Sequence, residues 1–208
     1  MSDIISQLIS GISNFAKKEC FPDSPYNDTV TKGQSPKAMV IGCSDSLVDP
    51  ILLTGAKPGE LFIHRNIAGL VPQCQDSSTS HYYGTSSVLE YGIARLKVEH
   101  LIILGHACCG GIAELLAKNE FDGFLGSWIE MALPAKNKII AAHKDKTLQQ
   151  QRHLCEKEAI KLSLQNLMTF PFVKKRVEED SLILHGWYFD RGNFSIYNRE
   201  KDIFEKKC

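Results

Sequence analysis

The sequence predicts an α/β protein with a mostly parallel central β-sheet flanked by helices. Two apolar runs that end in glycine, residues 37–42 and 100–105, indicate buried strands, and a third β-rich run follows at 181–187. The stretches between these runs carry helical patterns. Because strands that alternate with helices usually pair in parallel, we expect helices on both faces of the sheet.

Each element has its own signal along the chain. Apolar residues from Ile4 to Ala16 line one face of a first helix, which Ser2 or Asp3 can cap. Residues 20–35 are rich in Pro, Asp, Asn and Gly, which predicts a loop. The expected strands are 37–42, 61–64, 100–105 and 181–187, with an edge strand at 193–197. Further helices are expected at 85–97, after 110–111 and across 125–169 with a break near 143–146.

The chain is expected to form one domain over residues 1–208. Its 208 residues can bury a sizeable core, and 43% hydrophobic with 23% charged residues is ordinary for a soluble globular protein. Neither an internal repeat nor an obvious linker interrupts the sequence. We divide it into an N-terminal helix and loop (1–35), an α/β core (36–197) and a charged, solvated tail (198–208).

Charge and cysteine usage exclude several classes of partner. The formal net charge is +0 at pH 7, so neither a nucleic acid nor an anionic membrane is expected as a partner. The longest apolar runs are too short to span a bilayer, and the N-terminus lacks the pattern of a signal peptide. Seven cysteines, an odd number, favour reduced thiols and therefore a cytoplasmic protein.

Metal-ligand side chains follow two of the predicted strands. Cys43 comes directly after the first strand, and His106 and Cys109 come after the third. In open α/β sheets, ligands bind beyond the carboxyl ends of the strands. Two thiolates and an imidazole suit Zn²⁺, and a missing fourth protein ligand leaves a position open for water, as in catalytic zinc sites. The alternative for Cys43 is a small buried hydrophobe at a strand end.

Asp45 lies two residues beyond Cys43, where a carboxylate could face a water at the open metal position. The structural alternative is an Asx-turn or a helix N-cap, both common for an Asp that follows a strand. His64 and His81 lie in segments near the predicted site and are candidates for proton transfer.

Four ordered motifs surround these residues and resemble the β-class carbonic anhydrases. The resemblance is close over residues 33–115, with a weaker echo in LHGWYF at 184–189. The motifs are CSDSLVDP at 43–50, PGELF at 58–62, RNIAGLVP at 65–72 and GHACCGG at 105–111.

The resemblance implies zinc-dependent, reversible hydration of CO₂ to bicarbonate and a proton. One Zn²⁺ per subunit would be held by Cys43, His106 and Cys109, and Asp45 would orient the attacking oxygen. In this family the N-terminal helix lies across a partner subunit. We therefore expect a homodimer, with further assembly into a tetramer left open.

The resemblance also implies a substrate pocket of the plant-like subtype. Gln34 stands in the Gly-Gln-Ser-Pro-Lys stretch of that subtype and would bind substrate from across the dimer interface. Phe62, Ile67 and Tyr91 match its apolar pocket, and the backbone N–H of Gly110 matches a donor to a substrate oxygen. Ordinary core packing is the alternative for the three apolar positions.

The chain departs from the family at Leu47. The usual Cys-x-Asp-x-Arg pattern has an Arg here, which would hold the Asp carboxylate in a bidentate ion pair. Leu47 has no donor, so we hypothesise that Asp45 can bind the zinc itself and that activity is reduced. Arg65 is a candidate substitute partner.

Other functions remain open at this stage. A catalytically weak or silent zinc-binding relative would keep the three ligands without turning over CO₂. A hydrolase of CO₂ analogues such as CS₂ or COS could use the same metal site. A thiol redox protein, based on the adjacent Cys108 and Cys109, ranks last.

Overall fold

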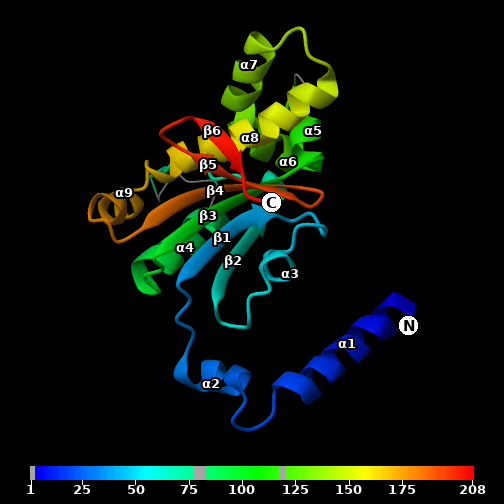
Figure 1. Cartoon of the computed structure of the whole chain (residues 1–208), viewed down its shortest axis with the longest axis vertical. Coiled ribbons are helices and arrows are strands. Elements are labelled where there is room, and N and C mark those ends of the chain that lie inside the picture. The colour runs from blue at the N-terminus through cyan, green and yellow to red at the C-terminus, as the bar shows by residue number, and fades with distance from the viewer. Residues whose placement is uncertain (1–2, 77–82, 118–119) are drawn as a thin grey trace.

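The computed structural model describes residues 3–76, 83–117 and 120–208, and its centre is one sheet (Figure 1). Within these residues the sheet has six strands in the order β2-β1-β3-β4-β5-β6. The first four strands in this order pair in parallel and the last two are added antiparallel, which confirms the mostly parallel sheet. The strands are β1 (Ala38–Cys43), β2 (Leu61–Asn66), β3 (His100–His106), β4 (Ile183–Asp190), β5 (Asn193–Asn198) and β6 (Ile203–Lys206).

Helices connect the strands and cover the sheet. The longest, α8, packs on β3 and β4. Short 3₁₀ turns at Ile67–Gly69 (η1) and Glu130–Ala132 (η3) and a π-helical turn at Tyr91–Arg95 (η2) complete the fold. The helices are α1 (Asp3–Glu19), α2 (Pro25–Lys32), α3 (Pro50–Thr54), α4 (Tyr83–Glu90), α5 (Gly110–Ala117), α6 (Gly123–Ile129), α7 (Leu133–Ala142), α8 (Leu148–Leu167) and α9 (Pro171–Glu178).

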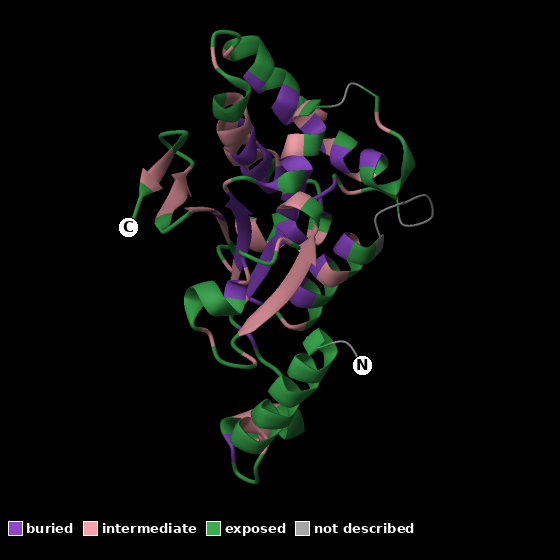
Figure 2. Ribbon diagram, turned by 90° about the vertical axis from the view of Figure 1, so that its right-hand side faces the viewer, coloured by how far each residue is buried: buried purple, intermediate pink, exposed green. Residues whose placement is uncertain are grey.

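The main core lies between the sheet and the helices that cover it (Figure 2). Met39 and Ile41 of β1 and Leu101 and Ile103 of β3 point into this core and are almost completely buried. Helix α8 can lie close to the sheet because β3 and β4 have glycine beneath it. A Cβ atom at Gly105, for example, would lie 2.6 Å from Ile160 Cδ1.

The register of the parallel strands brings the predicted ligands to one edge of the sheet. Cys43 pairs with Asn66 at the end of β2, and Gly42 pairs with Leu104 near the end of β3. His106 ends β3, so it reaches the same edge as Cys43 although the two lie far apart in sequence.

Two segments differ from the sequence-based expectations. The expected loop at 20–35 contains α2, which begins where the Ser24 side chain accepts a hydrogen bond from Asn27 N and Pro25 occupies the first turn. The expected tail at 198–208 contains β6, which pairs with β5, so β5 is not an edge strand. Helices α3 and α9 were not predicted either.

The helix expected at 85–97 changes its winding part of the way along. Helix α4 ends at Glu90, and the next residues form the π-helical turn η2. Leu89 and Gly92 are buried, whereas Tyr91 is 49% exposed. Tyr91 is therefore not a core residue of this subunit.

Helix α1 stands away from the sheet, as both views show (Figures 1 and 2). It has no buried residue, and its apolar face, including Leu8, Ile12 and Phe15, is exposed. Phe15 packs edge-on against Tyr26, with ring centroids 5.4 Å apart. Within the described part of the chain, none of the helices is both long and apolar enough to cross a membrane.

Candidate metal centre

Three ligand side chains meet at the carboxyl edge of the sheet. Cys43 ends β1, His106 ends β3 and Cys109 lies in the turn that leads into α5. Their ligand atoms all lie within 4.8 Å of one another, and all three residues are buried. The two Sγ atoms are 4.0 Å apart. This is the set that the sequence predicted.

His106 presents an unpaired nitrogen to this group. Its Nδ1 donates a hydrogen bond to the Ala107 carbonyl at 2.9 Å, which leaves Nε2 with a free lone pair. Nε2 is buried and has no hydrogen-bond partner among the described residues. A buried polar atom without a partner is costly, and a metal ion removes that cost. The three donors therefore fit a zinc ion.

Backbone N–H groups surround both sulfur atoms. A hydrogen bond from the Cys109 thiol lowers the pKa of Cys43 most, and the N–H groups of Asp45 and Ala68 also donate to its sulfur and lower that pKa. That same thiol–thiolate contact, together with burial, raises the pKa of Cys109. The two thiols are therefore coupled, because the one that ionises first is held by the hydrogen bond from the other.

Cys109 also occupies the N-cap of α5. Its carbonyl accepts the first helical hydrogen bond, from Ala113 N at 3.0 Å. The N–H groups of Gly111 and Ile112 donate to its sulfur and lower its pKa, which opposes the larger effects that raise it. A helix N-terminus favours negative charge, so this position suits a thiolate ligand.

The loop after β1 is held by Arg65. Its guanidinium donates to the carbonyl oxygens of Cys43 and Asp45, at 2.9 and 2.6 Å, and to Asp49 Oδ2 at 2.8 Å. Asp49 in turn caps the N-terminus of α3. Arg65 therefore fastens the main chain of Asp45, which is a different contact from the carboxylate pairing considered from the sequence.

Asp45 has a main-chain partner for its side chain. Its Oδ1 accepts a hydrogen bond from Leu47 N at 2.9 Å, which is the Asx-turn weighed above as the structural alternative. The Leu47 side chain is 81% exposed. Among the described residues, the group of ligand atoms within 4.8 Å consists of Cys43, His106 and Cys109, without Asp45.

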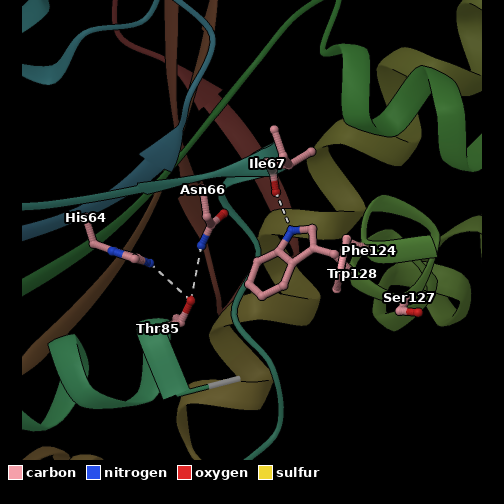
Figure 3. Close-up of a pocket in the computed structure, with 8 residues that line it drawn as sticks. His64, Asn66, Ile67, Thr85, Phe124, Ser127 and Trp128 are labelled. Atoms are coloured by element: carbon pink, nitrogen blue, oxygen red, sulfur yellow. Dashed lines mark hydrogen bonds between the residues drawn. The ribbon is translucent and has the colours of Figure 1, made fainter. Parts of the chain in front are cut away.

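A cavity of about 700 Å³ adjoins the metal centre, and Figure 3 shows the residues that line it. Ile67 lines it, and the next residue, Ala68, donates its N–H to Cys43. Trp128 Nε1 donates to the Ile67 carbonyl at 2.8 Å, and Figure 3 shows its ring beside Ile67. The cavity is lined by His64, Asn66, Ile67, Gly84, Thr85, Phe124, Ser127 and Trp128.

Of the two histidines considered for proton transfer, His64 lines this cavity. Its Nε2 lies 3.1 Å from Thr85 Oγ1, and burial lowers its pKa. His81 falls outside the described residues.

The residues expected to bind substrate divide between the two ends of the sheet. Ile67 and Gly110 lie at the carboxyl edge, next to the ligands. Phe62 of β2 pairs with Met39 of β1, and Met39 precedes Cys43 by four residues. Phe62 is therefore about 13 Å from the level of Cys43, measured along the strands. Tyr91 packs against Phe62, with ring centroids 5.7 Å apart. Gln34 is exposed and precedes β1, at the same end as Phe62.

One residue that contacts the site gave no signal in the sequence. Glu156 of α8 is only 3% exposed and accepts hydrogen bonds from Cys109 N at 3.0 Å and Tyr188 Oη at 2.7 Å. Burial raises the pKa of Glu156, whereas these two hydrogen bonds act to lower it. Its partners lie 47 and 32 residues away in the chain, so a local pattern could not reveal it.

Fold and site together define a class of protein. A buried Cys-His-Cys group at the carboxyl edge of a parallel sheet, next to an open cavity, is typical of a zinc enzyme with an α/β fold. The family follows from comparison with known proteins. A family model for carbonic anhydrase matches residues 38–195, and the chain belongs to this family, in its β class.

Individual relatives agree with this assignment. Beta carbonic anhydrase 3 of Arabidopsis thaliana is 35% identical over 202 residues, which cover 94% of this chain and 77% of that protein. The solved β-carbonic anhydrase CcaA has a TM-score of 0.88 at 25% identity and covers 100% of this chain and 93% of its own. A tetrameric β-carbonic anhydrase from the fungus Sordaria macrospora has a TM-score of 0.76 at 26% identity, covering 100% of this chain and 98% of its own. The protein is thus a carbonic anhydrase with a site for one zinc ion.

Proposed function

We propose that this chain catalyses the reversible hydration of CO₂ to bicarbonate and a proton, as a homodimer with one Zn²⁺ per subunit. The observation that carries the proposal is the buried Cys43–His106–Cys109 group, in which His106 Nε2 has no hydrogen-bond partner within the part of the chain that the structure describes. When bound there, a zinc ion supplies an electrophile that activates water toward CO₂.

The protein supplies orientation and an apolar path for the substrate. Asp45 is held by Leu47 N through one carboxylate oxygen, and its other oxygen can accept a hydrogen bond from the attacking water. The Gly110 N–H, at the start of α5, is the proposed donor to a substrate oxygen. Ile67 supplies an apolar wall, which suits CO₂ because it carries no charge.

The activity is proposed to be reduced because Leu47 replaces the Arg of the family pattern. A bidentate Arg would hold both oxygens of the Asp45 carboxylate. Among the described residues, the hydrogen bond to the Asp45 side chain comes from Leu47 N. One bond leaves the carboxylate free to rotate about it, so the orienting effect on the attacking water is weaker.

The separation of the proposed substrate-binding residues supports a homodimer. Gln34, Phe62 and Tyr91 lie toward the amino ends of the strands, too far from the ligands of their own subunit to complete that site. A second copy can bring the same three residues to the first copy's metal centre. The exposed apolar face of α1 offers the contact area for such a pairing.

We also propose a cytoplasmic location. All seven cysteines lie within the described residues and are free thiols. Cys108 and Cys208 are exposed, and exposed thiols persist best in a reducing compartment. Fractionation of cells that produce the tagged full chain tests this proposal.

Stopped-flow CO₂ hydration by the zinc-loaded full chain tests the proposed activity. We expect hydration well above the buffer rate, and loss of both zinc and activity in Cys43→Ser. Cys74→Ser is the matched control, because Cys74 is a half-buried thiol outside the ligand group. A zinc-loaded chain that hydrates CO₂ no faster than buffer would refute the proposal. Parallel assays with COS and CS₂ would then identify an analogue hydrolase.

A further inference from the structure

We propose that Glu156 is a positioning residue for the metal ligand Cys109. This inference rests on the proposed zinc-dependent function, which it deepens. Glu156 is a buried carboxylate on α8 whose Oε1 lies 3.0 Å from Cys109 N. It therefore contacts the main chain of a ligand and does not belong to the ligand group.

The turn that carries Cys109 needs an external support. Cys108 has a φ of 59°, in the left-handed region that residues with a Cβ atom adopt at a cost. Such a conformation persists only where its surroundings enforce it. The direction of the Cys109 side chain depends on this turn, because Cys109 directly follows the strained residue.

Helix α8 supplies that support from two positions one turn apart. Arg152 Nη2 donates to Cys108 Sγ at 3.4 Å, and Glu156 accepts the hydrogen bond from Cys109 N. Arg152 Nε also lies 3.7 Å from Glu156 Oε1, an i,i+4 ion pair. The two side chains thus hold both residues of the turn, and they hold each other.

The Glu156 carboxylate is itself held from its other side. Tyr188 of β4, which is 2% exposed, donates its O–H to Glu156 Oε2 at 2.7 Å. A phenol has one hydrogen, so the 3.0 Å contact between Tyr188 Oη and His153 Nδ1 is a donation from the histidine. With a carboxylate at position 156, His153 therefore donates to Tyr188, Tyr188 donates to Glu156, and Glu156 also accepts from Cys109 N.

The consequence concerns the sulfur of Cys109. The N–H groups of Gly111 and Ile112 can reach this sulfur only while Cys109 keeps its N-cap conformation. Glu156 accepts the hydrogen bond from the Cys109 N–H and so keeps the turn in that conformation. Without an acceptor at position 156, a buried N–H would be left unpaired and the turn would relax away from the metal-binding geometry.

Two substitutions at position 156 separate positioning from bulk packing. Glu156→Gln keeps an oxygen that can accept the hydrogen bond from Cys109 N, and Tyr188 can accept from the new amide if it donates to His153 Nδ1 instead. Glu156→Leu keeps the volume without an acceptor. We expect zinc transfer to a chelator to be about 10- to 100-fold faster in Glu156→Leu, the usual scale for a residue that orients a metal ligand, and to change by less than about threefold in Glu156→Gln. Glu158→Leu on the same helix is the matched control, because Glu158 pairs with Lys138 and Lys161 away from the site.

The second readout is the absorption spectrum of the Co²⁺-loaded protein, which reports ligand geometry without requiring turnover. The thiolate and ligand-field bands should shift in Glu156→Leu and stay in place in Glu156→Gln and Glu158→Leu. If Glu156→Leu does not fold, Tyr188→Phe decides: loss of one hydrogen bond to the carboxylate should speed zinc release several-fold.

Wild-type zinc release and an unchanged cobalt spectrum in a folded Glu156→Leu variant would overturn the inference, as would equal losses in Glu156→Gln and Glu156→Leu. For Tyr188→Phe, an unchanged zinc release would overturn it in the same way. Because neither readout uses CO₂, failure of the proposed enzymatic function would be seen separately, as a zinc-loaded wild-type chain without hydration activity.

Discussion

Leu47→Arg tests the effect of the departure from the family pattern most directly. Leu47 is 81% exposed, so the substitution loses little packing and has room for a longer side chain. The loop around it is already fixed, because Arg65 binds the main chain of Asp45 and Leu47 N binds Asp45 Oδ1. The new guanidinium therefore adds donors and a positive charge beside the Asp45 carboxylate without changing the course of the loop.

The size of the effect follows from the exposure of the pair. Substitution of a residue that orients a group at a metal usually lowers activity or metal affinity by about 10- to 100-fold, which corresponds to roughly 1.4 to 2.7 kcal/mol. An ion pair at an exposed position contributes only about 0 to 1 kcal/mol in stability, so the lower end of that range applies. We expect kcat/KM for CO₂ hydration to rise on the order of tenfold in Leu47→Arg. Leu47→Lys should gain less, because an ammonium cannot pair bidentately with a carboxylate.

The assay is stopped-flow CO₂ hydration with a pH indicator, normalised to zinc content. Leu52→Arg is the matched control, because Leu52 is also 81% exposed and lies on the neighbouring helix α3. This variant adds the same charge seven residues after Asp45, whereas Leu47→Arg adds it two residues after Asp45. If Leu47→Arg is no faster than Leu52→Arg or wild type, the reasoning is wrong, and the Leu47 N–H with the anchored loop orients Asp45 sufficiently.

Three further predictions test the fold and the assembly. Gly186→Ala should destabilise the protein by about 1 to 3 kcal/mol in urea unfolding, because its Cβ would lie 2.9 to 3.1 Å from three side chains, while Gly11→Ala, with open space, should not destabilise it. Burial and the neighbouring His100 lower the pKa of His185, so the unfolded chain protonates this histidine at a higher pH than the folded chain. The contribution of neutral His185 to the free energy of unfolding should therefore be complete above pH 6.5 and be lost as the pH falls below it. His185→Gln should flatten this part of the pH dependence of the urea midpoint. Removal of residues 1–19 should convert the dimer to a monomer in sedimentation and abolish CO₂ hydration, and an active truncated monomer would contradict the divided pocket.

The strands and the metal ligands were predictable because their signals are local. Apolar runs that end in glycine predicted β1 and β3. Because ligands bind at the carboxyl ends of parallel strands, Cys43 and His106 could be assigned to one site. The Asx-turn of Asp45 was likewise among the alternatives, since its partner Leu47 is two residues away. Interactions between residues only a few positions apart can be predicted from the local sequence.

The missed secondary-structure elements have weak or ambiguous local signals. Strand β6 lies in a stretch rich in charged residues, and it forms because Ile196, Tyr197 and Asn198 of β5 are available to pair with it. Phe204 of this strand then packs 5.3 Å from the ring of Tyr197. Helix α2 was missed for another reason: its Pro, Asn and Asp content suggested a loop, although its Ser-Pro start is also a helix N-terminal signal.

The geometry of β2 explains why the proposed pocket needs two subunits. Phe62 and Ile67 are five residues apart on and just after one strand, so their positions are separated by roughly 16 Å. No side-chain rotation closes that gap, and bending the strand would break its pairing with β1 over the whole length of the register. Phe62 can therefore contribute to a pocket that contains Ile67 only if the two come from different copies. The fold thus gives the proposed dimer a role in completing the active site, in addition to stabilising the protein.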